Sequence, residues 1–272
     1  MNLYSIKVIK ELLKAHETTL KKHLGQNFLL EKKIAAKMLA AAQLSGKDTV
    51  YEIGPGLGTL TKELAQNASK VTAIEKDPAM VKILKETIKD LLNVEIIQAD
   101  ALKVALPQEK YKVVANLPYY LTSPLIRMFL EARNKPELMV FMVQKEIAQR
   151  ICAKPSTMSI LAVSVQFYAK VKIVSIVSKN SFWPRPKVDS AIIQIVPKKN
   201  LSSLDSDLFF RIVKIGFKQP RKQLGNNLSA GFNFTKDTVE AWLGKNNLQS
   251  TLRAQTLSVE DWVALTKSFP KT

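Results

Sequence analysis

Cysteine and histidine are scarce in this chain of 272 residues, which contains one cysteine, Cys152, and two histidines, His16 and His23. A single cysteine excludes an internal disulfide framework and a cysteine-rich zinc site. Two histidines leave little material for a histidine-based metal centre or a Ser-His relay. We therefore expect no metal, and a reaction that needs neither a thiol nor an imidazole.

Long apolar runs are also missing, because no stretch approaches the about 20 residues that a membrane-spanning helix needs. The first 21 residues are rich in lysine and lack the apolar core of a secretory signal. Their basic, amphipathic character would also suit an organelle transit peptide, but Glu11 and Glu17 count against that interpretation. We expect a cytoplasmic protein with no membrane partner.

Acidic residues are few, with 23 Asp and Glu against 41 Lys and Arg, which gives a formal net charge of +18. So large an excess favours binding to phosphate backbones through release of counterions. A need for solubility or a loose attraction to anionic membranes would also explain the excess, so charge alone does not distinguish these two explanations from nucleic-acid binding.

Short apolar runs alternate with helical stretches from about residue 49 to 197, which is typical of a parallel sheet covered by helices. The expected strands are residues 49–53, 70–74, 94–98, 112–115, 138–143, 171–177 and 191–196. The expected helices between them are residues 59–66, 78–92, 124–132, 145–151 and 158–168. The last two strands flank a Pro-rich segment (182–186) rather than a helix, so we expect them to pair antiparallel at the edge of the sheet.

The pattern becomes helical throughout after residue 200, over residues 208–217, 221–228, 235–242 and 258–268. We therefore place a domain boundary after residue 197, which separates an α/β domain of residues 1–197 from a helical domain of residues 198–272.

A glycine-rich turn follows the first expected strand, with Gly54, Gly56 and Gly58 at alternate positions. Glycine lets the backbone approach a ligand closely and adopt conformations closed to other residues. The spacing is G-x-G-x-G rather than the G-x-G-x-x-G dinucleotide fingerprint, and no lysine follows as it does in a P-loop. Taken alone, the turn fits an ordinary tight turn equally well.

Carboxylates end the next two expected strands, at Glu75 and Asp100. A carboxylate about 20 residues after such glycines accepts both hydroxyls of a ribose in dinucleotide-binding folds. Asp100 is suited to accept a hydrogen bond from the amino group of a bound adenine. An adenosine pocket without an evident phosphate site favours S-adenosylmethionine over NAD or ATP. The alternative is that these are merely exposed acids at strand ends.

Residues 116–119 read Asn-Leu-Pro-Tyr and follow another apolar run. Asn116 Oδ1 and the Leu117 carbonyl, beside a turn stiffened by proline, are two acceptors at fixed spacing. Such a pair suits a planar amino group with two N–H donors, such as that of adenine, while Tyr119 offers a ring on which the base can stack. An ordinary turn at the end of a strand is the alternative interpretation.

With these motifs the chain resembles the S-adenosylmethionine-dependent rRNA adenine N6,N6-dimethyltransferases, which act on small-subunit ribosomal RNA. The resemblance covers nearly the whole chain after residue 21, and residues 1–21 form an extension outside it. It is carried, in the family's order, by residues 23–29, 52–58, 75, 100, 116–119, 143–146, 182–191, 217–228 and 253–254. It implies a Rossmann-like class I methyltransferase fold, with a mostly parallel seven-stranded sheet and a small all-helical C-terminal domain that contacts RNA or the ribosome.

The resemblance also implies the roles of individual residues. Those expected to contact S-adenosylmethionine are Asn27, Leu29, Gly54, Gly56, Glu75, Asp100 and Asn116. Those expected to hold the target base are Asn116, Leu117, Tyr119 and, from the Pro-rich segment, Phe182. The residues expected to bind RNA are Arg185, Lys187, Arg221 and Lys222, although Pro220 stands where the family has a more basic cluster.

The implied function is dimethylation of the N6 amino groups of two adjacent adenosines near the 3' end of small-subunit (16S) rRNA, in the pre-30S particle, by a monomer. One alternative is an enzyme that methylates an adenine of large-subunit (23S) rRNA and confers antibiotic resistance. Another is a ribosome-assembly or transcription factor with little catalysis. A dehydrogenase that transfers hydride is disfavoured by the glycine spacing.

Overall fold

The computed structural model of the protein describes residues 1–21, 24–198 and 204–270. His23, at the start of the first motif, and residues 199–200, beside the expected domain boundary, lie outside the described residues. The chain divides into two compact units, one of residues 1–148 and 171–197 and one of residues 149–170 and 198–272.

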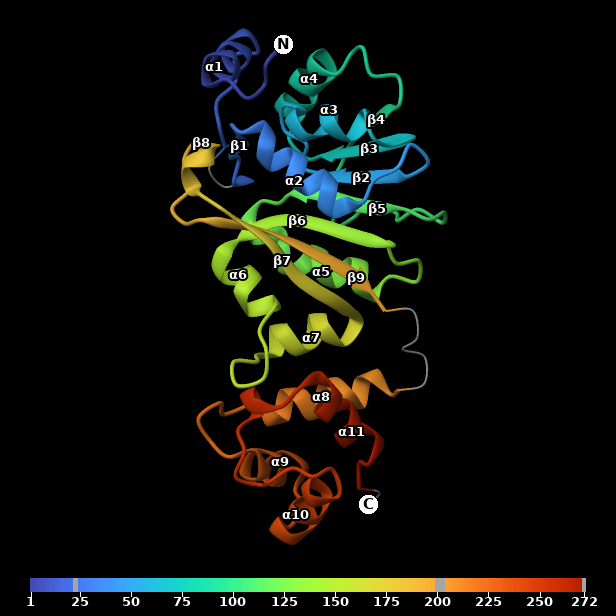
Figure 1. Ribbon diagram of the computed structural model, residues 1–272, viewed down its shortest axis with the longest axis vertical. Helices are drawn as coiled ribbons and strands as arrows, with labels where there is room; N and C mark the ends of the chain where they lie inside the picture. Colours follow the sequence, from blue (N-terminus) through green and yellow to red (C-terminus); the bar gives the residue numbers. More distant parts are fainter. Residues whose placement is uncertain (22–23, 199–203, 271–272) are drawn as a thin grey trace. The chain divides into compact units, whose positions relative to one another are not determined.

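The first unit contains a seven-stranded sheet of order β4-β3-β2-β5-β6-β9-β7 (Figure 1). Its strands are β2 (Thr49–Ile53), β3 (Lys70–Glu75), β4 (Val94–Gln98), β5 (Lys112–Asn116), β6 (Leu138–Gln144), β7 (Ala169–Val177) and β9 (Ser190–Pro197). Strands β2 to β6 pair in parallel, whereas β9 is antiparallel to β6. All seven strands were predicted to within two residues, and β7 and β9 are neighbours at the edge as expected.

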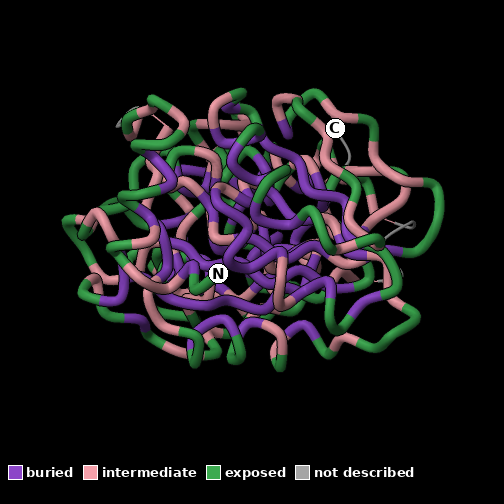
Figure 2. The backbone as a smooth tube through the Cα atoms, turned by 90° about the horizontal axis from the view of Figure 1, so that it is seen from above, coloured by how far each residue is buried: buried purple, intermediate pink, exposed green. Residues whose placement is uncertain are grey.

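Both faces of the sheet are covered, which is why its central strands are almost wholly apolar. On one face, Val50, Val114 and Val140 share an apolar cluster with Met38 and Leu60. Those two residues come from α2 (Lys32–Ala42) and α3 (Thr59–Ala65). Figure 2 shows buried backbone concentrated in the interior and exposed backbone mostly at the periphery.

The opposite face carries a chain of aromatic rings formed by Tyr51, Tyr111, Phe129 and Phe141. Successive ring centroids are 5.4, 6.5 and 6.4 Å apart. Phe129 belongs to α5 (Thr122–Glu131), so this contact packs α5 against the sheet. The sheet is therefore a rigid support whose strand ends carry the predicted motifs.

Helix α4 (Pro78–Thr87) ends five residues before the predicted position. Its start agrees with the prediction, because the Asp77 carboxylate accepts a hydrogen bond from the Ala79 amide at 3.1 Å and Pro78 occupies the first turn. At its end, the Thr87 hydroxyl donates to the Leu57 carbonyl at 2.8 Å. The chain must leave the helix there to reach β4, a requirement that the helical pattern of residues 78–92 does not show.

The N-terminal extension contains α1 (Ile6–Ala15), a helix that we did not predict. Ile9 and Leu12 are buried in one apolar cluster with Phe28 and Met80. Farther along, His16 Nε2 lies 2.7 Å from Glu86 Oε2. The extension is thus a packed part of the first unit.

The structure adds two strands of two residues each, β1 (Phe28–Leu29) and β8 (Phe182–Trp183), which pair with each other. Short 3-10 helices are η2 (Tyr119–Leu121) and η3 (Lys179–Ser181) in the first unit and η4 (Ala254–Thr256) in the second.

The second unit is helical and begins earlier in the chain than predicted. Helix α6 (Lys145–Ile151) leads into it, and the other helices are α7 (Ile160–Tyr168), α8 (Ser206–Gly216), α9 (Leu224–Phe232), α10 (Lys236–Lys245) and α11 (Val259–Lys267). We expected α7 to belong with the α/β domain of residues 1–197. Instead Phe167 of α7 stacks on Phe209 of α8, with ring centroids 4.1 Å apart, so residues 149–170 share the core of the C-terminal helices.

Arg221 and Lys222 lie in an exposed turn, and α9 begins at Leu224 rather than at residue 221 as predicted. The buried Asn227 side chain stabilises this turn, since its Nδ2 donates to the carbonyls of Gly216 at 2.7 Å and Gln219 at 3.1 Å.

Membrane-spanning length and apolarity are not found together in any helix of the described part of the chain.

Gly58 gives a test of how tightly the glycine turn is packed. Its φ is +87°, and a Cβ there would lie 2.8 Å from Leu84 Cδ1 and 3.1 Å from Thr87 Oγ1. We expect Gly58→Ala to lower the free energy of unfolding by about 1–3 kcal/mol, through backbone strain and overpacking. The measurement is urea unfolding followed by circular dichroism.

Gly46→Ala is the matched control, because a Cβ at Gly46 would meet nothing within 4 Å. We expect it to change stability by less than about 0.5 kcal/mol. Equal effects of the two substitutions would contradict the packing at Gly58.

Candidate functional site

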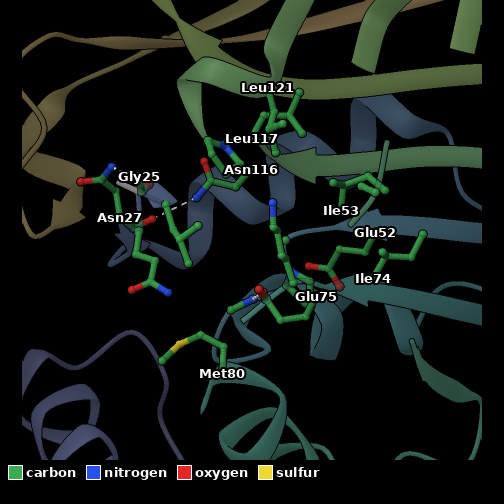
Figure 3. Close-up of a pocket in the computed structure, with 18 of the residues that line it drawn as sticks. Gly25, Asn27, Glu52, Ile53, Ile74, Glu75, Met80, Asn116, Leu117 and Leu121 are labelled. Atoms are coloured by element: carbon green, nitrogen blue, oxygen red, sulfur yellow. Dashed lines mark hydrogen bonds between the residues drawn. The ribbon is translucent and has the colours of Figure 1, made fainter. Parts of the chain in front are cut away.

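A pocket opens where the carboxyl ends of β2, β3 and β5 meet, the usual ligand position in an open parallel sheet (Figure 3). It gathers every residue predicted to contact the cofactor or the target base. Its lining comprises Leu24, Gly25, Gln26, Asn27, Phe28, Leu29, Glu52, Ile53, Gly54, Pro55, Gly56, Thr59, Leu60, Ile74, Glu75, Lys76, Met80, Ala99, Asp100, Ala101, Asn116, Leu117, Pro118, Tyr119, Tyr120, Leu121 and Phe182.

The glycine turn forms one wall of the pocket. Gly54 and Gly56 have φ values of +66° and +57°, in the left-handed region that favours glycine. A Cβ on Gly56 would lie 3.2 Å from the Phe28 ring. The turn thus lies against the segment that contains Phe28, and this leaves little room for a side chain at Gly56.

Glu75, at the end of β3, is buried, with 8% of its surface exposed. Burial raises its pKa, while hydrogen bonds from the backbone of Asp77, Gly56 and Lys76 favour the charged form. Its Oε1 accepts from the Asp77 amide at 2.8 Å and its Oε2 from the Gly56 amide at 3.1 Å. The carboxylate is therefore fixed in direction, and Glu75 is one of the residues that line the pocket (Figure 3).

Glu52, in the strand before the glycines, also lines the pocket, although it was not predicted to be a site residue. It is 1% exposed, and its Oε2 has no hydrogen-bond partner among the residues that the structure describes. Burial raises the pKa of Glu52 to about 8, and the charge of Glu75 adds to the effect. The Glu52 carboxyl is therefore mostly protonated at neutral pH.

Asp100 lies at the same edge of the sheet, as predicted from its place after β4. Its Oδ2 is 2.9 Å from Lys76 Nζ, and its Oδ1 accepts from the Leu102 amide at 3.1 Å. The hydrogen bond from Lys76 is the main cause that lowers the pKa of Asp100. The carboxylate is thus ionised, and each oxygen already has one partner.

The segment of residues 24–29 carries Asn27 and Leu29, and we call it the cofactor loop because these two residues are predicted to contact the cofactor. Asp77 anchors it, because Gln26 Nε2 donates to Asp77 Oδ2 at 3.0 Å and Lys21 Nζ lies 2.7 Å from Asp77 Oδ1. Leu29 is buried in the apolar cluster beneath the loop. The loop therefore crosses the pocket in a position fixed by a buried carboxylate.

Asn116 ends β5 and faces the cofactor loop. Its Nδ2 donates to the Asn27 carbonyl at 3.1 Å, the dashed line in Figure 3. Its Oδ1 has no hydrogen-bond partner in the described part of the chain, so the acceptor remains available to a ligand. The next residue is also fixed, since the Leu117 amide donates to the Met142 carbonyl at 3.1 Å.

Tyr119 and Phe182, the predicted stacking residues, both line the pocket. The Tyr119 hydroxyl shares a hydrogen bond of 3.1 Å with Ser190 Oγ, which restrains the half-buried ring. Burial raises the pKa of the Tyr119 hydroxyl. Phe182 exposes 4% of its surface and belongs to the same apolar cluster as Leu29. Phe182 is thus mainly part of the pocket wall.

Several lining residues were not predicted. Tyr120, which is 51% exposed, follows Tyr119 directly, and its place beside the tetrapeptide was a usable signal. Phe28 and Ile74 are likewise next to predicted residues. Met80 is a buried position of α4 that resembles any other core methionine, so only the fold brings it to the pocket.

The four cations predicted to bind RNA are exposed and lie outside the pocket. Arg185 and Lys187 belong to the first unit, and Arg221 and Lys222 belong to the second. The described residues contain no group of three or more His, Cys, Asp or Glu side chains placed to bind a metal ion.

Residues 17–271 match the family described as ribosomal RNA adenine dimethylase. A Dehalococcoides mccartyi (strain CBDB1) protein named ribosomal RNA small subunit methyltransferase A is 43% identical over 263 residues, which cover 94% of this chain and 90% of that protein.

Two solved structures resemble this one over 89% of the chain. A dimethyladenosine transferase from Plasmodium falciparum has a TM-score of 0.77 at 30% identity, with 96% of that chain covered. The 23S rRNA methyltransferase ErmE has a TM-score of 0.77 at 28% identity, with 98% of that chain covered. Helix α1 lies outside the residues that the family model matches.

The raised pKa of Glu52 predicts a pH-dependent stability. Because the folded protein binds this proton more tightly than the unfolded chain, stability falls as pH rises from the ordinary pKa of 4.5 towards about 8. Glu52→Gln removes this dependence, and a tenfold difference in proton affinity between the folded and unfolded chain corresponds to about 1.4 kcal/mol. The measurement is the free energy of unfolding in urea at pH 5 and at pH 8. We expect the stability of Glu52→Gln relative to the wild type to be at least about 1.4 kcal/mol greater at pH 8 than at pH 5. An equal difference at the two pH values would contradict a buried, protonated Glu52.

Proposed function

Because this chain belongs to the ribosomal RNA adenine dimethylase family, we propose that it dimethylates the N6 amino groups of two adjacent adenosines near the 3' end of small-subunit (16S) rRNA. The methyl donor of the family is S-adenosylmethionine. The observation that carries the proposal is the juxtaposition of an adenosine-type pocket with Asn116, whose Nδ2 is bonded to Asn27 while its Oδ1 is free of partners in the described chain.

The pocket fits the donor's adenosine. Glu75 has carboxylate oxygens for ribose hydroxyls, and Asp100 retains lone pairs for the adenine amino group. Ile53, Ile74 and Met80 supply apolar surface for the adenine base and for the methylene groups of the donor's methionine chain. Because a Cβ at Gly56 would lie 3.2 Å from Phe28, glycine lets the turn and the Phe28 ring form adjoining parts of the pocket wall.

When bound, S-adenosylmethionine supplies a methyl group activated by its sulfonium centre. The protein's own residues prepare the acceptor. The adenine amino group is a poor nucleophile because its lone pair is delocalised into the ring. For the first transfer, we propose that Asn116 Oδ1 and the Leu117 carbonyl accept its two N–H groups, which draws the nitrogen towards tetrahedral geometry and localises the lone pair. One of these protons is lost as the methyl group is added, so a single N–H remains to be accepted in the second transfer. Positioning and electrostatic complementarity then provide the rate enhancement, without a covalent enzyme intermediate.

The target adenosine must leave its stack to reach this pocket, at a free-energy cost of a few kcal/mol. Stacking on an aromatic ring offsets this by about 1–3 kcal/mol per contact. Tyr119 is suited to this role because its hydroxyl is bonded to Ser190 and its ring is half-buried. Phe182 would provide the second contact, which requires part of its buried ring to become accessible to the base.

We further propose that the substrate is the pre-30S particle and that a monomer acts on it in the cytoplasm. The exposed cations Arg185, Lys187, Arg221 and Lys222 would bind RNA phosphates, in keeping with the net charge of +18. The fold similarity to a 23S rRNA methyltransferase at 28% identity makes large-subunit RNA the second candidate substrate. The greater identity to a relative named for the small subunit favours the first.

Methyl transfer distinguishes the two substrates. We expect the protein to dimethylate adenosines in isolated small-subunit particles and to leave naked large-subunit RNA unmodified, with the modified positions mapped by mass spectrometry of RNA fragments. Asn116→Ala should lower kcat on the particles by about 10²–10³-fold, because it removes an acceptor for the reacting amine. Binding of S-adenosylhomocysteine should stay within about fivefold.

Asn67→Ala, at an exposed asparagine outside the pocket, is the control and should retain normal turnover. Exclusive modification of large-subunit RNA would replace the proposed substrate with the second candidate. Near-normal turnover of Asn116→Ala would remove the tetrapeptide from the mechanism.

The proposed phosphate contacts predict a salt-dependent affinity. We expect Arg221→Ala and Lys222→Ala each to weaken binding to small-subunit particles and to reduce the slope of log K against log salt by about 0.7–0.9. Lys245→Ala, at an exposed lysine that the proposal does not assign, should leave the slope unchanged. The measurement is a filter-binding titration over several salt concentrations, and unchanged slopes for both variants would exclude this turn from the RNA contact.

A further inference from the structure

The cofactor loop and the Pro-rich segment form one two-stranded sheet, although they are distant in sequence. Strand β1 of the loop pairs antiparallel with β8, so that Phe28 lies opposite Trp183 and Leu29 opposite Phe182. Figure 1 shows β1 and β8 side by side, away from the seven-stranded sheet. A residue expected to contact the methyl donor, Leu29, therefore lies opposite one expected to contact the target base, Phe182.

A side-chain contact extends this pairing beyond the end of β1. The Leu30 amide donates to the Ser181 carbonyl at 2.9 Å, and the Ser181 hydroxyl donates in return to the Glu31 carboxylate at Oε1. Ser181 is buried, with 3% of its surface exposed. The other oxygen of Glu31 lies 2.6 Å from Nζ of the exposed Lys33. Glu31 thus has one buried and one exposed partner.

The cofactor loop also determines the direction of Asn116. The Asn27 carbonyl accepts from Asn116 Nδ2, so the position of the loop determines which way Asn116 Oδ1 points (Figure 3). A shift of the loop would therefore disturb the proposed amine acceptor and, through β8, the proposed stacking residue Phe182.

Two segments joined in this way lose conformational freedom together. When a ligand orders one of them, less entropy remains to be lost when a second ligand orders the other, which gives positive cooperativity. Such coupling is reciprocal, because each ligand changes the affinity of the other by the same factor. The Glu31–Ser181 hydrogen bond is the side-chain link between the segments that substitution can remove without changing a residue that lines the pocket.

We propose that Glu31 and Ser181 are positioning residues that couple binding of the methyl donor to binding of the target base. The proposal rests on the proposed function. A purely structural role would lower thermal stability and leave the two binding events as strongly coupled as before.

The test measures the coupling directly in the full-length protein. The dissociation constant of S-adenosylhomocysteine is determined by calorimetry, first with the protein alone and then with saturating small-subunit particles whose target adenosines are unmethylated. We expect the particles to tighten its binding at least about fivefold in the wild type. In Ser181→Ala and in Glu31→Ala the factor should fall below about twofold, while binding in the absence of particles changes less than about threefold.

Two further variants separate positioning from stability. Glu31→Gln keeps an acceptor oxygen for Ser181 and should retain most of the coupling. Lys33→Ala removes only the exposed partner of Glu31 and should retain all of it. A melting temperature is recorded for each variant. If Ser181→Ala folds poorly, the coupling factors of Glu31→Ala, Glu31→Gln and Lys33→Ala still test the proposal.

The proposal would be overturned if both Ala variants kept the coupling factor of the wild type. It would also be overturned if the wild type methylated the particles but bound S-adenosylhomocysteine equally tightly with and without them. Loss of coupling in Lys33→Ala equal to that in Glu31→Ala would overturn it too, because the buried contact would then not be responsible. A wild-type protein that transfers no methyl group to either RNA would overturn the proposed function first, and this inference with it.

Discussion

The hydrogen bond from the Gly56 amide to the Glu75 carboxylate is the constraint on which the pocket depends. It fixes the glycine turn after β2 relative to the end of β3. Glu75 also accepts from the Asp77 amide, and the Asp77 carboxylate in turn accepts from Ala79, Gln26 and Lys21. Two acidic positions on one short segment thus connect the glycine turn, the start of α4 and the cofactor loop.

The same connections extend to the groups proposed to handle the target base. The cofactor loop that Asp77 anchors presents the Asn27 carbonyl to Asn116, and its strand β1 pairs with β8, the strand that contains Phe182. An acceptor fixed in this way does not need to reorient when a reacting group arrives, which is the basis of electrostatic catalysis by preorganised groups. The donor side and the base side of the pocket are therefore parts of one hydrogen-bonded structure rather than two adjacent sites.

The parts of this arrangement that could be predicted from sequence are those with a local signal. The strands were predicted to within two residues because they are apolar runs bounded by turns, and Glu75, Asp100 and Asn116 were placed together because parallel strands end at one edge of the sheet. Strands β1 and β8 have two residues each, which is too short for any periodicity. Helix α7 has apolar residues that would fit either domain, and tertiary contacts such as that of Phe167 with Phe209 assign it to the second unit. Helix α1 does carry a helical signal, with apolar residues at positions 9, 12 and 13, but an amphipathic, lysine-rich segment does not by itself show what its apolar face packs against.

The proton affinities of the two buried glutamates, Glu52 and Glu75, are determined by tertiary packing and could not be predicted from the sequence. Burial raises the pKa of both Glu52 and Glu75, and the charge of Glu75 raises the pKa of Glu52 further. Glu75 accepts hydrogen bonds from two backbone amides, whereas one oxygen of Glu52 has no partner in the described chain. The backbone amides therefore favour the ionised form of Glu75, whereas burial favours the protonated form of Glu52. This division leaves the pocket with one oriented carboxylate at the predicted ribose position and one neutral carboxyl behind it. The glycine-rich turn thus contributes a charge-stabilising amide as well as space for close approach, and that amide explains why the turn and Glu75 form a single binding element.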